Sequence, residues 1–255
     1  MSLLNVKGLT ITVKGITVVK DLNFSIEKYK TVAIIGESGS GKTVTALSIM
    51  SLLDKTKFLV QGSVLFLGED LLKKCEKDIK KLCLEKIAIV HQNPFRSLSP
   101  VEKIKTNIAN IYKIKKRKIE NNLLEYLFSQ MQLDMNKTLN KYPYECSGGE
   151  LQRVMMLLSL LFKPRLLICD EVTSSLDYET SLSLISLLKA LKEKNNMSLL
   201  FISHDISIVK EIADEVIIMK DGKIVEAGLT KEIFKNPKTN YTHALIKASY
   251  LEKTC

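Results

Sequence analysis

The chain has 255 residues, of which 45% are hydrophobic and 26% charged, which excludes a disordered or collagen-like protein and suits one large α/β domain, or one core with a smaller lobe. Its net charge of +10 suits nucleic acid, an anionic membrane face or a nucleotide as partner, and is equally compatible with a surface that is merely rich in lysine. No apolar run reaches the roughly 18 residues of a membrane span, and the first residues do not form a secretory signal, so we expect any membrane role to come through a partner.

The first part of the chain predicts a small antiparallel lobe and then a buried strand. Short β-branched runs at Leu9–Val13, Thr17–Val19 and Leu22–Ile26 are typical of paired strands. Thr31–Gly36 has the apolar composition of a buried strand and ends in glycine, and Val44–Leu53 has the pattern of a helix. A polar segment rich in glycine and serine joins these two elements.

The rest of the chain alternates strands with helices. Lys86–Gln92 predicts a strand, and residues 93–162 are mostly helical in pattern. Three further strands and the two amphipathic helices between them are predicted at Arg165–Asp170, Ser198–Ser203, Glu215–Lys220, Tyr178–Lys194 and Ile206–Ala213. Asp221-Gly222 then turns a hairpin into Lys223–Ala227. This alternation predicts a parallel sheet that is covered by helices on both faces.

Two compositional features have simple interpretations. The basic stretch Lys113–Lys118 suits nucleic acid or anionic lipid, but a solvated helix face explains it more simply. The five cysteines form no CxxC pair and are odd in number, which favours reduced thiols in a cytosolic protein over disulfides or a zinc site. They are Cys75, Cys83, Cys146, Cys169 and Cys255.

A phosphate-binding loop is the strongest single signal. Gly36–Thr43 has the sequence GESGSGKT, which fits the pattern GxxxxGK followed by Ser or Thr, and it lies between a predicted strand and a predicted helix. Glycines let backbone N–H groups wrap phosphate oxygens, and the following helix directs its positive end at the same anion. Lys42 can reach the β and γ phosphates, and the Thr43 hydroxyl can bind Mg²⁺. The expected nucleotide-binding residues are Gly36, Ser38, Gly39, Ser40, Gly41, Lys42 and Thr43.

Two adjacent carboxylates end one of the apolar strands. Asp170 falls at the C-terminal edge of its strand, where open α/β sheets bind ligands. We expect Asp170 to hold Mg²⁺ through water and Glu171 to act as the general base on an attacking water. An acidic strand end is by itself more often simply solvated, and the phosphate loop in the same chain is what favours the functional interpretation.

A third segment carries a family resemblance. Cys146–Arg153 has the sequence CSGGELQR and resembles LSGGQ, the signature motif of the ATP-binding-cassette (ABC) ATPases, at that family's distance before Asp170. Gln92 follows a strand and resembles the Q-loop glutamine. Ser174–Asp177 resembles the D-loop, and His204, at the end of an apolar strand, resembles the switch histidine. The resemblance extends over about residues 4–248.

The resemblance implies an architecture and a set of roles. The fold would be α/β: a RecA-like P-loop ABC ATPase core, a small antiparallel β lobe and a helical lobe at about 93–162 that bears the signature, all in one domain over 1–255. Two such cassettes would pair head to tail, with each ATP and its Mg²⁺ between one phosphate loop and the other subunit's signature. The implied catalytic residues are Glu171, His204 and Gln92, and the implied metal ligands are Thr43, Gln92 and Asp170. Ser147, Gly148, Gly149 and Asp177 join the nucleotide-binding set, Ser147 and Gly149 by touching the partner's γ-phosphate.

Two further stretches resemble one branch of the family, the oligopeptide, dipeptide and nickel importers. Gln92–Pro100 (QNPFRSLSP) resembles QxPxxSLNP, and Asn236–Leu245 (NPKTNYTHAL) resembles the C-terminal NPxHPYTxxLL with Asn240 in place of proline. No cysteine-rich tail follows, so the chain is most similar to the nickel-importer ATPase. The resemblance implies a paralogous ABC ATPase, two permease subunits and, indirectly, an extracytoplasmic solute-binding protein as partners, no nucleic acid, and a peripheral place on the cytoplasmic face of the membrane.

Several positions depart from the family pattern. Cys146 stands in place of leucine and Val172 in place of proline, and neither side chain need touch phosphate. Glu150 replaces the signature glutamine, and its spacing from Ser147 predicts a capping box at the start of a helix rather than a catalytic role.

The aromatic residue that stacks on adenine in the family is missing. Its place falls near Val13, which offers only edge contact, so we expect weak discrimination between ATP and GTP. Tyr29 and Phe24 are the nearby rings that would compensate.

Two other classes of ABC ATPase are the alternatives. A non-transport member, such as an iron–sulfur assembly factor, needs neither of the two importer-like stretches. A nucleic-acid member, of DNA repair or translation, carries coiled-coil or zinc insertions or a second cassette. Only 104 positions separate Lys42 from Cys146, which leaves no room for such an insertion.

Overall fold

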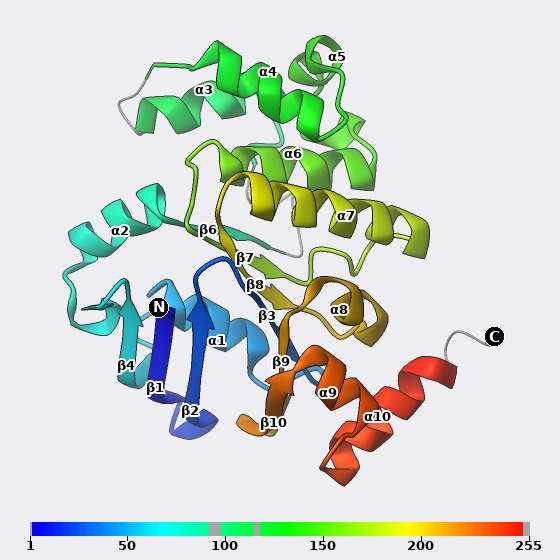
Figure 1. Ribbon diagram of the computed structural model, residues 1–255. Helices are drawn as coiled ribbons and strands as arrows, with labels where there is room; N and C mark the ends of the chain where they lie inside the picture. Colours follow the sequence, from blue (N-terminus) through cyan, green and yellow to red (C-terminus); the bar gives the residue numbers. More distant parts are fainter. Residues whose placement is uncertain (1, 92–97, 115–117, 252–255) are drawn as a thin grey trace.

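Two β-sheets frame the molecule in the computed structural model, which describes residues 2–91, 98–114 and 118–251 (Figure 1). The antiparallel sheet has the strand order β2-β1-β4-β5, and the larger sheet has the order β10-β9-β3-β8-β7-β6. Neighbours in the larger sheet pair in parallel except in the β9–β10 hairpin. The strands are β1 (Ser2–Val13), β2 (Ile16–Glu27), β3 (Thr31–Ile35), β4 (Phe58–Phe66), β5 (Glu69–Asp70), β6 (Ile87–Val90), β7 (Leu166–Asp170), β8 (Ser198–Ile202), β9 (Glu215–Lys220) and β10 (Lys223–Leu229).

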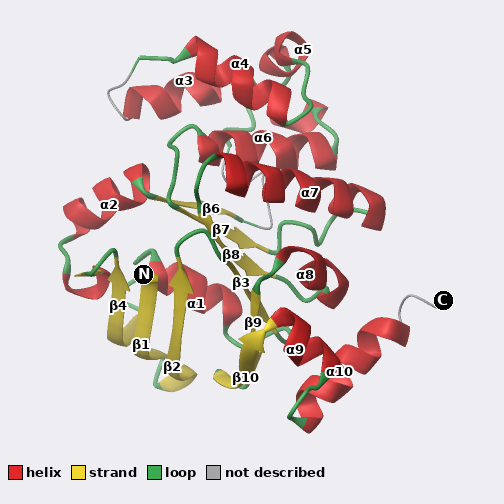
Figure 2. Cartoon of the chain, viewed as in Figure 1, coloured by secondary structure: helices red, strands yellow, loops and turns green. Residues whose placement is uncertain are grey.

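Helices α6, α7 and α8 cover one face of the parallel sheet, α1 and the antiparallel sheet cover the other, and α3, α4 and α5 lie together at one end of the molecule (Figure 2). The helices are α1 (Lys42–Ile49), α2 (Glu76–Glu85), α3 (Ile104–Ile114), α4 (Asn121–Gln130), α5 (Met135–Asn140), α6 (Gly148–Leu160), α7 (Tyr178–Lys194), α8 (Ile206–Ile212), α9 (Thr230–Lys235) and α10 (Asn240–Leu251). None of the helices in the described part of the chain is long and apolar enough to span a bilayer.

The parallel sheet separates two hydrophobic cores. Side chains alternate between the faces of a strand, so Leu199 and Phe201 of β8 are buried with residues of α6, α7 and α8. Leu200 and Ile202 of the same strand are buried with residues of α1 and the antiparallel sheet. This doubly covered sheet confirms the α/β fold that the sequence predicts.

Local details differ from the sequence predictions. β2 is one strand where two runs are predicted, because Asp21, with φ of 51°, interrupts its pattern without ending it. β4 and α2 are not predicted at all; Gly62, with φ of 106°, breaks the alternation of β4. The helix predicted at Val44–Leu53 begins two residues earlier and ends at Ile49, because the chain leaves the helical conformation at Ser51, with φ of 52°.

Some predictions fall partly outside the described residues. Gln92 and residues 93–97 lie there, as do residues 115–117 of the basic stretch. The extent of the helical lobe and the single-domain assignment stay predictions. The cysteines Cys75, Cys83, Cys146 and Cys169 are free thiols, and Cys255 lies outside the described residues.

Candidate functional site

The loop between β3 and α1 is shaped by its glycines. Gly36 follows β3 with φ of 155°, and a Cβ there would lie 2.1 Å from the carbonyl oxygen of Met219, in β9. Gly41, the N-cap of α1, has φ of 98°, and a Cβ there would meet Val19 of β2 at 3.0 Å. Only glycine satisfies both the backbone conformation and the lack of space, so the pattern of the loop has a direct structural cause.

The β9–β10 hairpin fixes β2 against this loop. The N–H of Lys20 donates to the carbonyl oxygen of Gly222 at 2.7 Å. Gly222 is buried, and a Cβ there would lie 2.4 Å from the carbonyl oxygen of Val18. The loop therefore lies against β9 and β2.

Lys42 is folded into the loop that precedes it. Its ammonium donates to the carbonyl oxygens of Gly36 and Glu37, at 2.8 Å each, and contacts the Ser40 hydroxyl at 3.5 Å. Burial lowers the pKa of Lys42, and the charges of Glu171 and Asp170 oppose that shift. The loop thus holds a buried cation where the sequence predicts phosphate binding.

Thr43 and Asp170 come together from distant parts of the chain. The Thr43 hydroxyl donates to Asp170 Oδ1 at 3.1 Å. Burial raises the pKa of Asp170, and the hydrogen bond from Thr43 opposes the shift. Among the residues that the structure describes, no group of three or more His, Cys, Asp or Glu side chains is placed to hold a metal ion. A hydroxyl and a carboxylate side by side nevertheless fit Mg²⁺, which commonly takes one or two protein oxygens and completes its shell with phosphates and water.

Glu171 and His204 face each other beside this pair. His204 Nδ1 lies 3.7 Å from Glu171 Oε1, and the imidazole is largely exposed. Glu171 has φ of 52° and donates its N–H to the carbonyl oxygen of Ile202, at the end of β8. A non-glycine residue rarely adopts this conformation except at turns and functional sites. The two predicted catalytic residues therefore share one edge of the sheet, whereas Gln92 lies outside the described residues.

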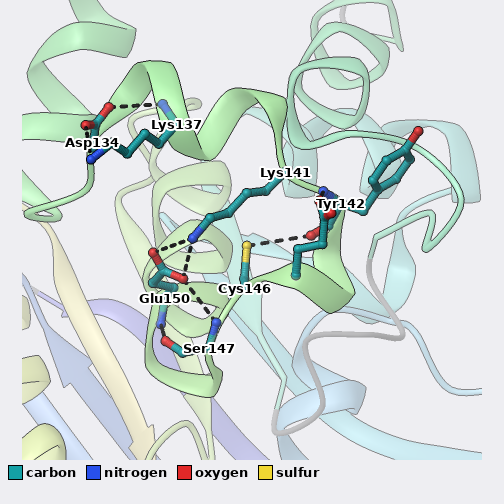
Figure 3. Close-up of polar contacts among 8 residues, drawn as sticks. Asp134, Lys137, Lys141, Tyr142, Cys146, Ser147 and Glu150 are labelled. Atoms are coloured by element: carbon teal, nitrogen blue, oxygen red, sulfur yellow. Dashed lines mark hydrogen bonds and ion pairs between the residues drawn. The ribbon is translucent and has the colours of Figure 1, made fainter.

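The signature segment starts α6 with a capping box (Figure 3). The N–H of Glu150 donates to Ser147 Oγ at 3.2 Å, and the N–H of Ser147 donates to Glu150 Oε2 at 3.1 Å. This reciprocal pair confirms the prediction made from the spacing S-x-x-E. Glu150 thus fixes the position of Ser147 and of the first turn of the helix.

Lys141 completes this arrangement and is not predicted by the sequence. Its ammonium lies 2.9 Å from both carboxylate oxygens of Glu150 (Figure 3). The hydrogen bond from Lys141 lowers the pKa of Glu150. No local pattern links these residues, because a short helical turn at Pro143–Glu145 separates them. Cys146, at the usual leucine position, is half-buried, and its thiol donates to the carbonyl oxygen of Tyr142 at 3.8 Å.

The signature segment and the start of α7 line one hollow of about 490 Å³. Asp177 caps α7 by accepting the N–H and the hydroxyl of Thr180, at 2.9 and 2.6 Å. Ser147, Gly148 and Gly149 lie across the hollow, which is lined by no described residue of Gly36–Thr43. The structure therefore brings the predicted site residues together in two separate groups.

A larger, mostly apolar groove of about 930 Å³ lies elsewhere on the surface. Its walls come from the segment after α1, from α2 and β6, and from α3 and α6. It extends to His91, the last described residue before Gln92. The sequence does not predict α2, which forms one wall of this groove.

Val13, at the predicted adenine position, pairs with Ile16 and with neither of the candidate rings, Tyr29 and Phe24. Val13 is half-buried at the end of β1, opposite Ile16, which is 68% exposed. The N–H of Tyr29 donates to Ser198 at the start of β8, so Tyr29 lies at the sheet edge opposite the loop. Phe24 is half-buried and packs against the core between the sheets. Tyr29 therefore lies away from the loop, and the suggestion that Phe24 replaces the ring stays a prediction.

Comparisons with known proteins agree with this geometry. The family model described as ABC transporter matches residues 19–174. The oligopeptide transport ATP-binding protein OppD of Bacillus subtilis is 38% identical over 96% of this chain and 71% of its own length. The metal-staphylopine import system ATP-binding protein CntD of Staphylococcus aureus is 36% identical over 96% of this chain and 93% of its own. The solved structure of cbiO1 from Clostridium perfringens, part of an ABC transporter complex, superposes with a TM-score of 0.80 at 24% identity over 99% of both chains, and so shares the fold.

Proposed function

Because this chain belongs to the ABC transporter family, as an ATP-hydrolysing subunit of an importer, we propose that the phosphate loop and the end of β7 form its hydrolytic site. The observation that carries the proposal is the hydrogen bond between Thr43 and Asp170, which joins loop and strand across 127 positions of sequence. The buried ammonium of Lys42 supplies positive charge at the same place.

The proposed reaction transfers the γ-phosphoryl group of ATP to water. Backbone N–H groups of the loop and Lys42 hold the phosphates. Water attacks the γ-phosphorus, its proton passes to the Glu171 carboxylate, and ADP leaves with the bridging oxygen. Thr43, Asp170 and the predicted ligand Gln92 would hold Mg²⁺, which would supply positive charge to the phosphate oxygens. His204, beside Glu171, contacts the γ-phosphate in this scheme.

The hollow at the signature serves the nucleotide of a second cassette in this proposal. The start of α6 presents the Ser147 hydroxyl and backbone N–H groups, which suit an anion. These groups lie apart from the chain's own phosphate loop, so a head-to-tail dimer is needed to use both. The partner cassette is a paralogue in our proposal, as the importer resemblance implies.

The apolar groove is the proposed contact with the membrane subunits. Its walls combine core and helical elements, so closure of the dimer would move whatever occupies it. We propose that one of two permease subunits docks there. The chain would then be peripheral at the cytoplasmic face, with a solute-binding protein acting only through the permeases.

The proposed cargo is a short peptide or nickel, free or chelated. The names of OppD and CntD concern oligopeptide and metal-staphylopine import, at similar identity to this chain. The resemblance of the sequence to nickel importers makes nickel the first cargo to test. The non-transport and nucleic-acid alternatives draw no support from these relatives.

Reconstitution with the cognate permease subunits and solute-binding protein tests the proposal. Proteoliposomes would be supplied with ATP and with radioactive nickel, free or chelated by histidine, or a labelled tripeptide. Uptake should depend on ATP, disappear with Glu171→Gln and persist with Glu193→Gln, a control at the far end of α7. If neither nickel nor the tripeptide were taken up, the proposed cargo would be contradicted. If the rate of ATP hydrolysis were the same with and without the permeases, the proposed coupling of hydrolysis to transport would be contradicted.

A further inference from the structure

The C-terminal motif NPKTNYT has no part in the proposed reaction, yet several of its residues are held in place by hydrogen bonds. Glu226, buried in β10, accepts the N–H groups of Lys238 and Thr239 at 2.9 and 3.2 Å. The hydroxyls of Thr239 and Thr242 lie 2.8 Å apart at the start of α10. The first turn of α10 is thereby anchored to the edge of the parallel sheet.

Tyr241, on this first turn, reaches the phosphate loop. Its hydroxyl accepts the N–H of Glu37 at 3.3 Å, a contact across 204 positions of sequence. The ammonium of Lys220, at the end of β9, lies 4.6 Å from the centre of the Tyr241 ring. The ring is half-buried, so anchor, ring and hydroxyl form one continuous connection from α10 to the loop.

Glu37 is the residue that links Tyr241 to Lys42. Its N–H donates to Tyr241, while its carbonyl oxygen accepts from the Lys42 ammonium at 2.8 Å. The adjacent Gly36 is wedged against the carbonyl of Met219 in β9. The first turn of the loop is therefore held from outside by Tyr241 and from inside by Lys42.

We propose that Tyr241 is a positioning residue for nucleotide binding, which fixes the first turn of the phosphate loop and couples the docking of α10 to occupancy of the loop. The proposal rests on the proposed function in one respect, that ATP binds at this loop. Tyr241 touches no reacting atom, so its effect falls on affinity. By linkage, ATP in turn stabilises the docked position of α10.

Tyr241→Phe in the full chain tests the affinity. It keeps the ring and its contact with Lys220 and removes only the hydroxyl. Loss of one such hydrogen bond should weaken ATP binding about two- to ten-fold, measured by calorimetry, with kcat at saturating ATP unchanged. Tyr126→Phe is the matched control, because Tyr126 on α4 is also half-buried and has Lys194 4.6 Å from its ring centre. Equal affinity in Tyr241→Phe and wild type would overturn the proposal, whereas a wild-type chain that binds no ATP would overturn the proposed function itself.

Hydrogen exchange tests the coupling. ATP should slow exchange of the α10 amides in wild type, and this slowing should shrink in Tyr241→Phe but persist in Tyr126→Phe. A purely packing role would leave the ATP-dependent slowing the same in all three proteins. That result would contradict the coupling even if the affinity had fallen.

Discussion

The two groups of site residues are built in different ways. On the loop side, Thr43 meets Asp170 and Glu171 faces His204 through long-range contacts, and the charge of Asp170 acts on the buried Lys42. On the signature side, Ser147, Glu150 and Asp177 make contacts with residues three positions away, and Lys141 pairs with the carboxylate of Glu150. The loop side therefore depends on the whole fold for its geometry, whereas the signature side is organised locally before any partner arrives. We expect changes on the first side to affect chemistry and changes on the second to affect pairing.

The largest effect should come from the loop side. Glu171→Gln removes the proposed base and keeps its shape, so ATP should still bind and close the dimer while turnover falls about 10²- to 10⁴-fold. Phosphate release and ATP binding, measured on the same preparation, separate the two. Near-normal hydrolysis would remove Glu171 from the role of base.

The second effect should show that the signature side serves a partner. The isolated chain should be a poor ATPase, and below the dissociation constant of the dimer its specific activity should rise about in proportion to protein concentration. Addition of the paralogue and the permeases should raise it further. A high specific activity that does not change with protein concentration in the nanomolar range would contradict the prediction that the signature side serves a partner's nucleotide.

A third change should raise the affinity of the loop side for ATP. Val13→Tyr supplies the missing ring, and base stacking is worth about 1–3 kcal/mol, so ATP affinity should rise roughly ten-fold or more. Wild type should prefer ATP over GTP by less than about ten-fold for the same reason. Ile114→Tyr, which places a ring at an exposed position at the end of α3, is the control. Unchanged ATP affinity in Val13→Tyr would exclude Val13 as the platform.

A smaller effect should come from Lys141. Lys141→Met leaves the Glu150 carboxylate unpaired beside the place proposed for the partner's phosphates, and activity at limiting protein should fall about two- to five-fold, the scale of an exposed ion pair. Adding Glu150→Gln in the same chain should restore it, since the uncompensated charge is gone. Lys73→Met is the control, because Lys73 pairs with Asp70 beside the antiparallel sheet, and neither residue lines the hollow at the signature. No recovery in the double variant would contradict the electrostatic explanation.

The smallest effect is on thermal stability: removing a carboxylate charge should change Tm in opposite directions on the loop side and on the signature side. Burial raises the pKa of Asp170, so at neutral pH its charge destabilises the fold and Asp170→Asn should raise Tm; this gain should shrink as the pH falls toward the ordinary carboxyl range. The pKa of Glu150 is lowered, so its charge stabilises the fold above its ordinary pKa and Glu150→Gln should lower Tm. Each shift should be about 1–4 °C by calorimetry at pH 7. Changes in Tm of the same sign for Asp170→Asn and Glu150→Gln would contradict this contrast between the two sides.

The sequence predicts those contacts that follow from a short spacing or from a rule of the fold. The capping box at Ser147 and Glu150 is predictable because its two residues lie three positions apart. The meeting of Thr43 and Asp170 is predictable because both follow parallel strands at the same sheet edge. The α/β fold is predictable for a related reason, since its strands are short, apolar and separated by helices.

The contacts that the sequence does not predict lack both kinds of signal. Lys141 reaches Glu150 across a short helical turn whose direction no pattern reveals. Tyr241 reaches Glu37 from a terminal helix whose docking depends on a buried Glu226 cap. β4 and α2 escape prediction because Gly62 breaks one pattern, while α2 is short and bears many charges. In each case tertiary packing, rather than a local sequence pattern, determines the contact or the element.

The tight contact between Gly222 and β2 has a practical consequence for protein engineering. An exposed two-residue turn is normally a safe place to insert an affinity tag or a fluorescent label. Here the turn after β9 is buried at Gly222, where even a methyl group would strike the Val18 carbonyl at 2.4 Å, and β9 itself abuts the phosphate loop through Met219. A label at this hairpin would report on the loop only by displacing it, so tags for this protein belong in a turn that is remote from the loop, such as the one at Lys28-Tyr29, at the opposite edge of the sheet.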